Sequence, residues 1–248
     1  MCHDDDALPP QPPDPGPVAR HGHLELQADD GNAFAAYEAV PETVRRGNLI
    51  LLPDRRGLHP FYFRLTQAFA AAGFHTIAFD YFGRTAGTPD RGEGFPWGEH
   101  GMYLQPDHVL ADARAVAGRL RAAQDAPVLS VGFCMGGGHS WRLAASDLGL
   151  AGAIGLYGLP GMVYGVLDQL TAPIQLHVAG NDMVSPVHAF EALARHLEER
   201  GKAFDMRVYD GAPHAYFDEH FAEWAQACQQ TWEAMLGFAD RVESALAG

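Results

Sequence analysis

Basic residues and long apolar runs are both scarce in this sequence. Its 248 residues contain 17 Lys and Arg against 31 Asp and Glu, which gives a formal net charge of −14. Nucleic acids are bound through clustered Lys and Arg, so we expect no nucleic-acid partner. No apolar stretch reaches the roughly 20 residues that cross a bilayer. Residues 1–6 are acidic where a signal peptide carries positive charge. The sequence therefore predicts a cytoplasmic protein with no membrane partner.

Cysteine is equally scarce, with Cys2, Cys134 and Cys228 lying far apart in the chain. They form no CxxC pair and no Cys/His zinc spacing, and their odd number argues against a disulfide framework. We therefore expect no bound metal and no cofactor. Taken alone, each thiol is more simply explained as an inert buried or tail residue than as a reactive group.

The chain divides into a short tail and one domain. Residues 1–20 are acidic and then proline-rich, a composition typical of a disordered tail. Residues 23–28 and 33–39 alternate polar and apolar positions around the turn 29–32, which predicts a hairpin. No repeat or interdomain linker follows, so residues 21–248 are expected to form a single domain.

From residue 48 onward, short apolar runs alternate with helical segments. A continuously apolar run of this length is typical of a strand buried on both faces. Such alternation predicts an α/β fold, with a mainly parallel sheet, helices on both faces and the hairpin as an antiparallel edge. The expected strands are 48–53, 75–80, 127–132, 151–157, 174–179 and 204–209.

The segment 132–137 reads Gly-Phe-Cys-Met-Gly-Gly and lies where an apolar strand gives way to a helix. G-x-C-x-G is the spacing of a nucleophile elbow, with Cys134 in place of the usual serine. The flanking glycines allow a crowded turn, and the following helix N-terminus favours a thiolate. The N–H of Met135 is then placed to stabilise an oxyanion. The alternatives are a phosphate-binding turn, which lacks the required G-x-G-x-x-G or G-K-[ST] spacing, and an inert buried cysteine.

An acid and a histidine each follow a later strand. Asp182 comes after strand 174–179, and His214 after strand 204–209. The carboxyl ends of strands are where open α/β sheets place their binding groups. The chain order nucleophile, acid, base is that of the α/β-hydrolase fold, so Cys134, Asp182 and His214 are predicted to form a catalytic triad.

The elbow 132–137, the turn ending at Asp182 and the turn ending at His214 together resemble the dienelactone hydrolase (carboxymethylenebutenolidase) family. The stretch 79–84 also looks like that family's P-D-L-Y-x-R segment. The resemblance extends from about residue 23 to the C-terminus. It implies an α/β-hydrolase fold and a carboxylic ester hydrolase whose substrate is a small ester or lactone.

The resemblance also implies roles for four residues outside the triad. The turn 53–57 matches the family turn that carries a thiol-modulating glutamate, a position filled here by Asp54. By the same match, the Arg55 N–H becomes the second oxyanion donor and Arg84 a binder of a substrate carboxylate. Family members that take dienelactone have an arginine at the position of Asp218. An anion at this substrate-binding position is expected to weaken binding of a small anionic lactone.

The longest irregular stretch, 82–105, contains Trp97 and Tyr103. A loop of this length inside a compact domain is usually functional or disordered. We expect these two aromatic side chains to line a substrate pocket, and the alternative is that they fix the loop to the core.

The predicted activity is hydrolysis of activated esters or lactones through a thioester on Cys134. A thiolate is a good leaving group, so substrates with stabilised leaving groups, such as enol esters, suit it better than alkyl esters. Two other functions stay open. One is an acyltransferase or thioesterase with the same triad, and the other is a non-catalytic binding protein that keeps the pocket.

Overall fold

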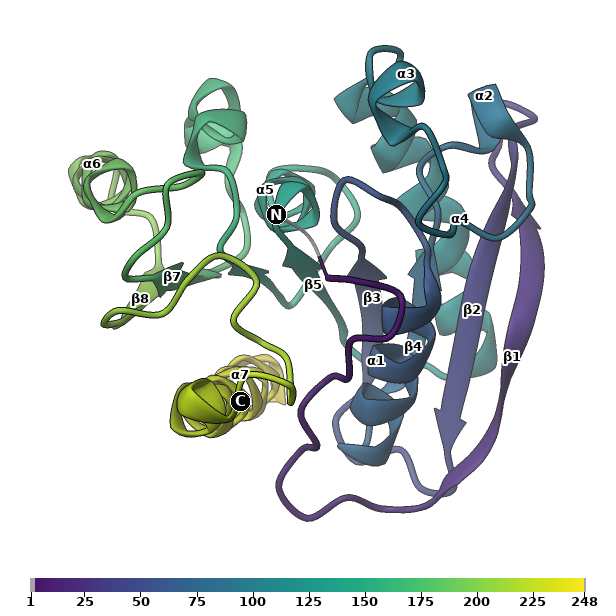
Figure 1. Cartoon of the computed structure of the whole chain (residues 1–248), viewed down its shortest axis with the longest axis horizontal. Helices are drawn as coiled ribbons and strands as arrows, with labels where there is room; N and C mark the ends of the chain where they lie inside the picture. Colours follow the sequence, from purple (N-terminus) through teal and green to yellow (C-terminus); the bar gives the residue numbers. More distant parts are fainter. Residues whose placement is uncertain (1–2, 248) are drawn as a thin grey trace.

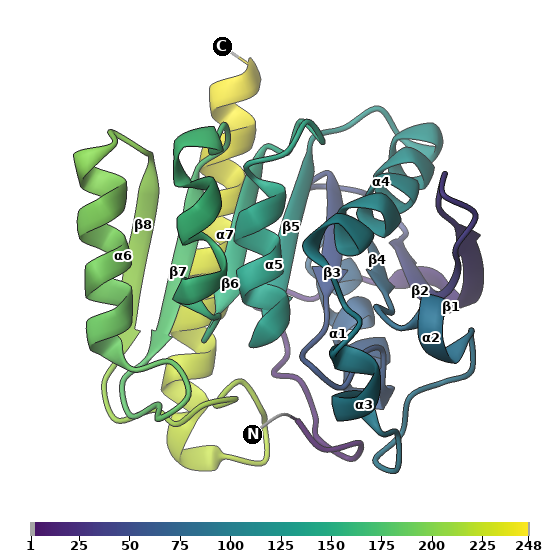
Figure 2. The same cartoon turned by 90° about the horizontal axis from the view of Figure 1, so that it is seen from above.

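The computed structural model describes residues 3–247 and is built around one eight-stranded sheet (Figures 1 and 2). The strand order is β1-β2-β4-β3-β5-β6-β7-β8. The strands are β1 (Val18–Gln27), β2 (Ala33–Pro41), β3 (Asn48–Leu52), β4 (His75–Phe79), β5 (Val128–Phe133), β6 (Gly152–Leu156), β7 (Ile174–Ala179) and β8 (Phe204–Tyr209).

The pairing of the strands confirms the expected fold class. Strand β2 pairs antiparallel with both β1 and β4, and every other neighbouring pair from β4 to β8 is parallel. The predicted hairpin is present, with Leu24 opposite Ala36, and its first strand begins at Val18.

Helices cover both faces of the sheet (Figure 2). Helices α1 and α7 pack on one face, and α4, α5 and α6 on the other. The helices are α1 (Pro60–Ala71), α2 (Gly83–Ala86), α3 (Trp97–Gly101), α4 (Pro106–Ala123), α5 (Met135–Leu143), α6 (Val187–Glu199) and α7 (Ala225–Ala247), with three 3₁₀ turns, η1 (Pro160–Met162), η2 (Tyr164–Gln169) and η3 (Ala222–Trp224).

Strand β3 shows why its sequence is apolar at every position from 49 to 52. Leu49 and Leu51 join the hydrophobic cluster under α1 and α7, whereas Ile50 and Leu52 join the cluster under α4. All four are at most 1% exposed. Burying each such side chain contributes about 1.5–3 kcal/mol. Because side chains on both faces of β3 are buried, burial stabilises this strand in the middle of the sheet.

Residues 3–13 lie packed against the domain, where the sequence predicts a disordered tail. The Arg64 guanidinium donates hydrogen bonds to the carbonyl oxygens of Asp5 and Ala7, at 2.8 and 3.1 Å. The Trp232 indole donates to the Pro10 carbonyl oxygen at 2.9 Å. The segment has little apolar surface to bury, but it offers carbonyl groups to partners far away in sequence. Residues 1 and 2 of the expected tail lie outside the described residues.

The connection 158–170 packs on the face of the sheet that α5 and α6 cover. Val163 and Leu167 belong to the same buried cluster as Trp141 of α5 and Phe190 of α6. Among the helices within residues 3–247, none combines the length and apolarity needed to cross a membrane.

Candidate active site

Cys134 sits at a sharp turn between β5 and α5. Its backbone has φ 54° and ψ −118°, a region that residues with a side chain rarely adopt and that costs about 1–3 kcal/mol. A Cβ on Gly132 would lie 1.9 Å from the Gly136 carbonyl oxygen. A Cβ on Gly136 would lie 2.2 Å from the Pro53 carbonyl oxygen. The predicted elbow therefore needs both glycines, because the backbone around Cys134 leaves no room for a side chain.

His214 and Asp182 meet at the neighbouring strand ends. His214 follows β8, Asp182 follows β7, and His214 Nδ1 lies 2.6 Å from Asp182 Oδ2. The other oxygen, Oδ1, accepts the Val184 N–H at 2.7 Å. Asp182 is thus held in place from both sides and can fix the orientation of the imidazole.

The charges of this pair stabilise each other. Burial alone would raise the pKa of Asp182, but the hydrogen bonds from His214 and from the N–H groups of Val184 and Ser185 hold it below its usual value. Burial would lower the pKa of His214, but the hydrogen bonds with Asp182 and Cys134 outweigh it and raise the pKa to about 9. The geometry thus favours an imidazolium at His214 beside a negatively charged partner.

The two expected oxyanion donors lie in the segments that follow β3 and β5. Met135 is the first residue of α5, where backbone N–H groups have no partner within the helix. Arg55 is the third residue after β3 and lies two positions beyond Pro53, whose carbonyl oxygen borders Gly136. The Arg55 guanidinium stacks over the Trp97 ring at 4.2 Å from the centroid, which brings these two predicted site residues together.

Asp54 is a buried carboxylate with a side chain that is 1% exposed. Its Oδ1 accepts the Arg56 N–H at 2.8 Å, and its Oδ2 lies 3.4 Å from His59 Nε2. Burial would raise the pKa of Asp54, but His59 and the Arg56 N–H hold it below its usual value. Asp54 and Cys134 both lie close enough to Tyr81 to raise its pKa further than burial alone does. A thiol-modulating role for Asp54 remains a prediction.

Three predicted substrate-binding residues have other partners or are exposed in this structure. Arg84, in α2, donates to Asp112 Oδ2 at 2.7 Å and to Asp30 Oδ2 at 2.5 Å. Two carboxylates therefore already balance its charge, and the expectation that it binds a substrate carboxylate remains a prediction. Tyr103 is 62% exposed on its loop. The Asp218 Oδ1 accepts the N–H groups of Leu8 and His220.

Sequence analysis missed two aromatic residues near the triad. Tyr157 directly follows β6 with a φ of 37°, and its ring centroid lies 5.0 Å from that of His214. His3 lies against Tyr157, with 2.9 Å between His3 Nε2 and the Tyr157 hydroxyl. Tyr157 carries a signal that the sequence does contain, since it follows a strand end as Asp182 and His214 do. His3 carries none, because its partners are more than 50 residues away. In the part of the chain that the structure describes, no group of three or more His, Cys, Asp or Glu side chains is arranged to hold a metal ion.

Comparisons with known proteins agree on one family. A sequence model described as "Dienelactone hydrolase family" matches residues 34–242. Two relatives share the name "Putative carboxymethylenebutenolidase". The one from Escherichia coli K12 is 28% identical over 91% of this chain and 88% of that protein. The one from Saccharolobus solfataricus is 31% identical, but the match covers only 46% of this chain and 44% of that protein.

The fold has close counterparts among solved structures. A "Putative Dienelactone Hydrolase" from Klebsiella pneumoniae superposes with a TM-score of 0.75 at 24% identity, covering 89% of this chain and 99% of that one. This likeness shows the α/β-hydrolase fold, independently of the arrangement of individual site residues.

Proposed function

The chain belongs to the dienelactone hydrolase family, and on this premise we propose that it hydrolyses activated esters or lactones with Cys134 as the nucleophile. One observation carries the proposal. A thiol on a strained elbow shares the carboxyl edge of the sheet with His214, whose Nδ1 lies 2.6 Å from Asp182 Oδ2. Nucleophile, base and orienting acid are the three parts that covalent acyl transfer requires.

In the proposed mechanism, the Cys134 thiolate attacks the carbonyl carbon of the substrate and forms a C–S bond. The N–H groups of Met135 and Arg55 stabilise the resulting oxyanion. The C–O bond to the leaving group then breaks, and the His214 imidazolium gives its proton to the departing oxygen. A thioester remains on Cys134. Water, deprotonated by His214, hydrolyses it and regenerates the thiolate–imidazolium pair.

The choice of sulfur restricts the substrate. In the tetrahedral intermediate, thiolate competes with the leaving oxygen, and a simple alkoxide is the poorer leaving group of the two. The intermediate from an alkyl ester therefore reverts, whereas that from an enol or aryl ester proceeds. We propose enol esters, enol lactones and similarly activated esters as the substrate class.

The two positions at which the family resemblance implies carboxylate binding favour neutral substrates within this class. Arg84 is bound by two carboxylates, and the position of Asp218 carries a negative charge. At these two positions, where the family resemblance implies binding of a substrate carboxylate, the chain therefore offers no cation without a carboxylate partner. A neutral aryl ester is the first substrate to test.

The experiment compares Cys134→Ala with a matched control, Cys228→Ala, on p-nitrophenyl acetate. Cys228 is also buried, and its Sγ contacts the Tyr216 carbonyl oxygen in the core. We expect kcat/KM to fall by at least about a thousandfold in Cys134→Ala and by less than about threefold in Cys228→Ala. Full activity of Cys134→Ala would refute the nucleophile assignment. Intact-mass detection of an acyl group on the quenched wild-type enzyme, absent from Cys134→Ala, would identify the thioester.

A further inference from the structure

Residues 3–8, which we name the N-terminal strap, lie along the carboxyl-end edge of the sheet (Figures 1 and 2). His3 is 3% exposed and stacks on Phe61, with 3.8 Å between ring centroids and 7° between ring planes. Its Nε2 lies 2.9 Å from the Tyr157 hydroxyl, and the Tyr157 ring is 5.0 Å from that of His214. The first described residue of the chain is therefore one side chain away from the catalytic base.

One set of anchors ties the strap to the segment after β3. The Arg56 guanidinium binds the His3 carbonyl oxygen and the Asp5 carboxylate. Arg64, on α1, donates to the carbonyl oxygens of Asp5 and Ala7 at 2.8 and 3.1 Å. Because Arg56 directly follows the proposed oxyanion donor, these anchors hold the strap beside the site of reaction.

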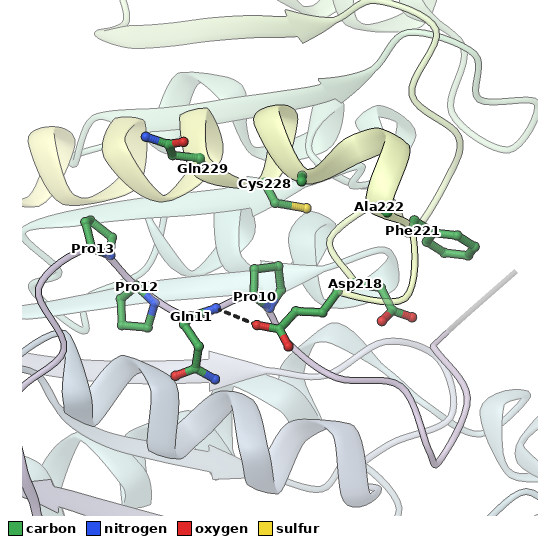
Figure 3. A pocket seen from close by; sticks show the side chains of 11 residues that line it. Pro10, Gln11, Pro12, Pro13, Asp218, Phe221, Ala222, Cys228 and Gln229 are labelled. Carbon is green, nitrogen blue, oxygen red and sulfur yellow. Dashed lines mark hydrogen bonds between the residues drawn. The ribbon is translucent and has the colours of Figure 1, made fainter.

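A second set ties the strap to the loop that carries His214. The Leu8 N–H donates to Asp218 Oδ1 at 3.2 Å, and the Glu219 N–H donates to the Leu8 carbonyl oxygen at 2.8 Å. Immediately beyond the strap, the Gln11 N–H donates to the Glu219 carboxylate at 3.2 Å (Figure 3). The strap thus bridges the loops that follow β3 and β8, with the triad between them.

The strap is held by polar contacts more than by apolar packing. Ala7 is its one side chain in the main hydrophobic cluster of the described residues, and Leu8 is 38% exposed. Where the chain leaves the strap, Pro10, Pro12 and Pro13 line a cavity of about 620 Å³ against Phe221 and α7 (Figure 3). A segment with few buried apolar contacts opens locally at a lower free energy than the core does.

The strapped site leaves little surface for a substrate. Cys134 and Asp182 are each 6% exposed, and the His214 side chain is 7% exposed. Burial also lowers the pKa of His3 to about 3, against the opposing charge of Asp54, so the ring is neutral at physiological pH. Because His3 is uncharged, its attachment depends on the stacking with Phe61 and the contact with the Tyr157 hydroxyl, and not on an ion pair.

We propose that the N-terminal strap controls which molecules reach Cys134, and that His3 is the specificity-determining side chain that limits their size. With the strap in place, small molecules reach the thiol faster than bulky ones, and displacement of the strap removes this difference. The part that concerns esters rests on the proposed function. The part that concerns access to the thiol does not.

The test compares alkylation of Cys134 by two reagents that share one reactive group, iodoacetamide and the bulky 5-iodoacetamidofluorescein. The ratio of the two rate constants reports access alone, because a change in thiolate reactivity affects both reagents alike. Peptide mapping separates Cys134 from Cys2 and Cys228. For deletion of residues 2–8 and for His3→Gly, we expect the bulky-to-small ratio to rise at least tenfold.

Arg64→Met and Arg45→Met form a matched pair that leaves the strap sequence intact. Both remove an arginine that donates to backbone carbonyls of the N-terminal segment, but Arg45 binds Asp14, beyond the strap. We expect a severalfold rise of the ratio in Arg64→Met and no change in Arg45→Met. If the deletion variant does not fold, this pair decides the outcome.

The proposal fails if the ratio in Arg64→Met and in every folded strap variant equals that of the wild type. Hydrolysis of p-nitrophenyl acetate and p-nitrophenyl octanoate, measured in parallel, separates it from the proposed function. A raised alkylation ratio with no hydrolysis by any variant supports the strap and refutes the hydrolase. Hydrolysis with an unchanged ratio supports the hydrolase and refutes the strap.

Discussion

Replacing Asp182 by asparagine tests the electrostatics of the site most directly. The pKa of His214 is raised from 6.5 to about 9 although burial acts to lower it. At about 1.4 kcal/mol per pH unit, the folded protein favours the imidazolium by roughly 3 kcal/mol more than the unfolded chain does. The hydrogen bond with Asp182, 2.6 Å long, is the largest contribution that opposes burial.

Asparagine keeps an oxygen for the Val184 N–H but removes the charge beside His214. With this contribution lost and only the interactions with Cys134 left to oppose burial, the pKa of His214 should fall below 9. In a serine protease, the corresponding change costs about 10⁴ in kcat because the imidazole loses its correct tautomer. We expect a loss of 10²–10⁴ here, and a shift of the pH dependence of kcat/KM that belongs to the coupled Cys134–His214 pair.

Stability should change with pH in a defined window. The folded pKa of His214 is raised, so its contribution is fully present below pH 6.5 and is lost as the pH rises toward about 9. Urea unfolding of the wild type should show this loss, and Asp182→Asn should not. Asp168→Asn is the control, since it removes an exposed carboxylate that forms an ion pair with Arg200 among the described residues, whereas Lys202 donates to the Asp168 backbone carbonyl oxygen, which the substitution keeps. Equal pH dependence in wild type and Asp182→Asn would refute the electrostatic account of the triad.

Three further perturbations test other parts of the structure. Gly136→Ala places a Cβ 2.2 Å from a carbonyl oxygen and should lower the Tm measured by calorimetry by many degrees. The control is Gly118→Ala in α4, where a Cβ meets nothing within 4 Å, and this change should raise the Tm slightly. Arg84→Met leaves the buried carboxylate of Asp112 with the hydrogen bond from Asn32 but no cationic partner, and should cost about 3 kcal/mol in urea unfolding, without changing the preference between neutral and anionic lactones. The pKa of Glu38 is lowered to about 2 by the hydrogen bond from His75, which outweighs burial. Its stabilisation is therefore present above pH 4.5 and lost between pH 4.5 and 2, and Glu38→Gln should flatten that part of the acid unfolding curve.

The parts of the fold that follow from local pattern could be predicted from the sequence. Leu49–Leu52 had to be a strand buried on both faces because every residue is apolar, and the elbow had to be a turn because Gly132 and Gly136 flank a helix start. Cys134, Asp182 and His214 each follow an expected strand, so the sequence predicted that each lies at a strand end. Parallel strands bring such ends to one edge of a sheet, so sequence order translates into proximity.

The parts that depend on contacts between distant residues could not be predicted. Arg84 matches a family position, but its ion pairs with Asp30 and Asp112 arise only when the hairpin and α4 meet α2. His3 stands in a segment whose composition is typical of disorder, and its partners Phe61 and Tyr157 are far away in the chain. In both cases, the tertiary partner decides the role of the residue.

Access to the thiol and its reactivity are physically coupled in this structure. The burial that hinders a substrate also strengthens the interaction of His214 with Asp182, because charges attract more strongly away from water. Loosening the strap should therefore change the pKa of His214 in two opposing ways while it opens the path to Cys134: hydration weakens the attraction to Asp182, which lowers this pKa, and relieves burial, which raises it. The two effects can be told apart. A change in reactivity shifts the pH profile of alkylation for both reagents equally, whereas a change in access shifts their ratio at every pH. If Arg64→Met changed the profile but left the ratio unaltered, the strap would act on the electrostatics of the site alone.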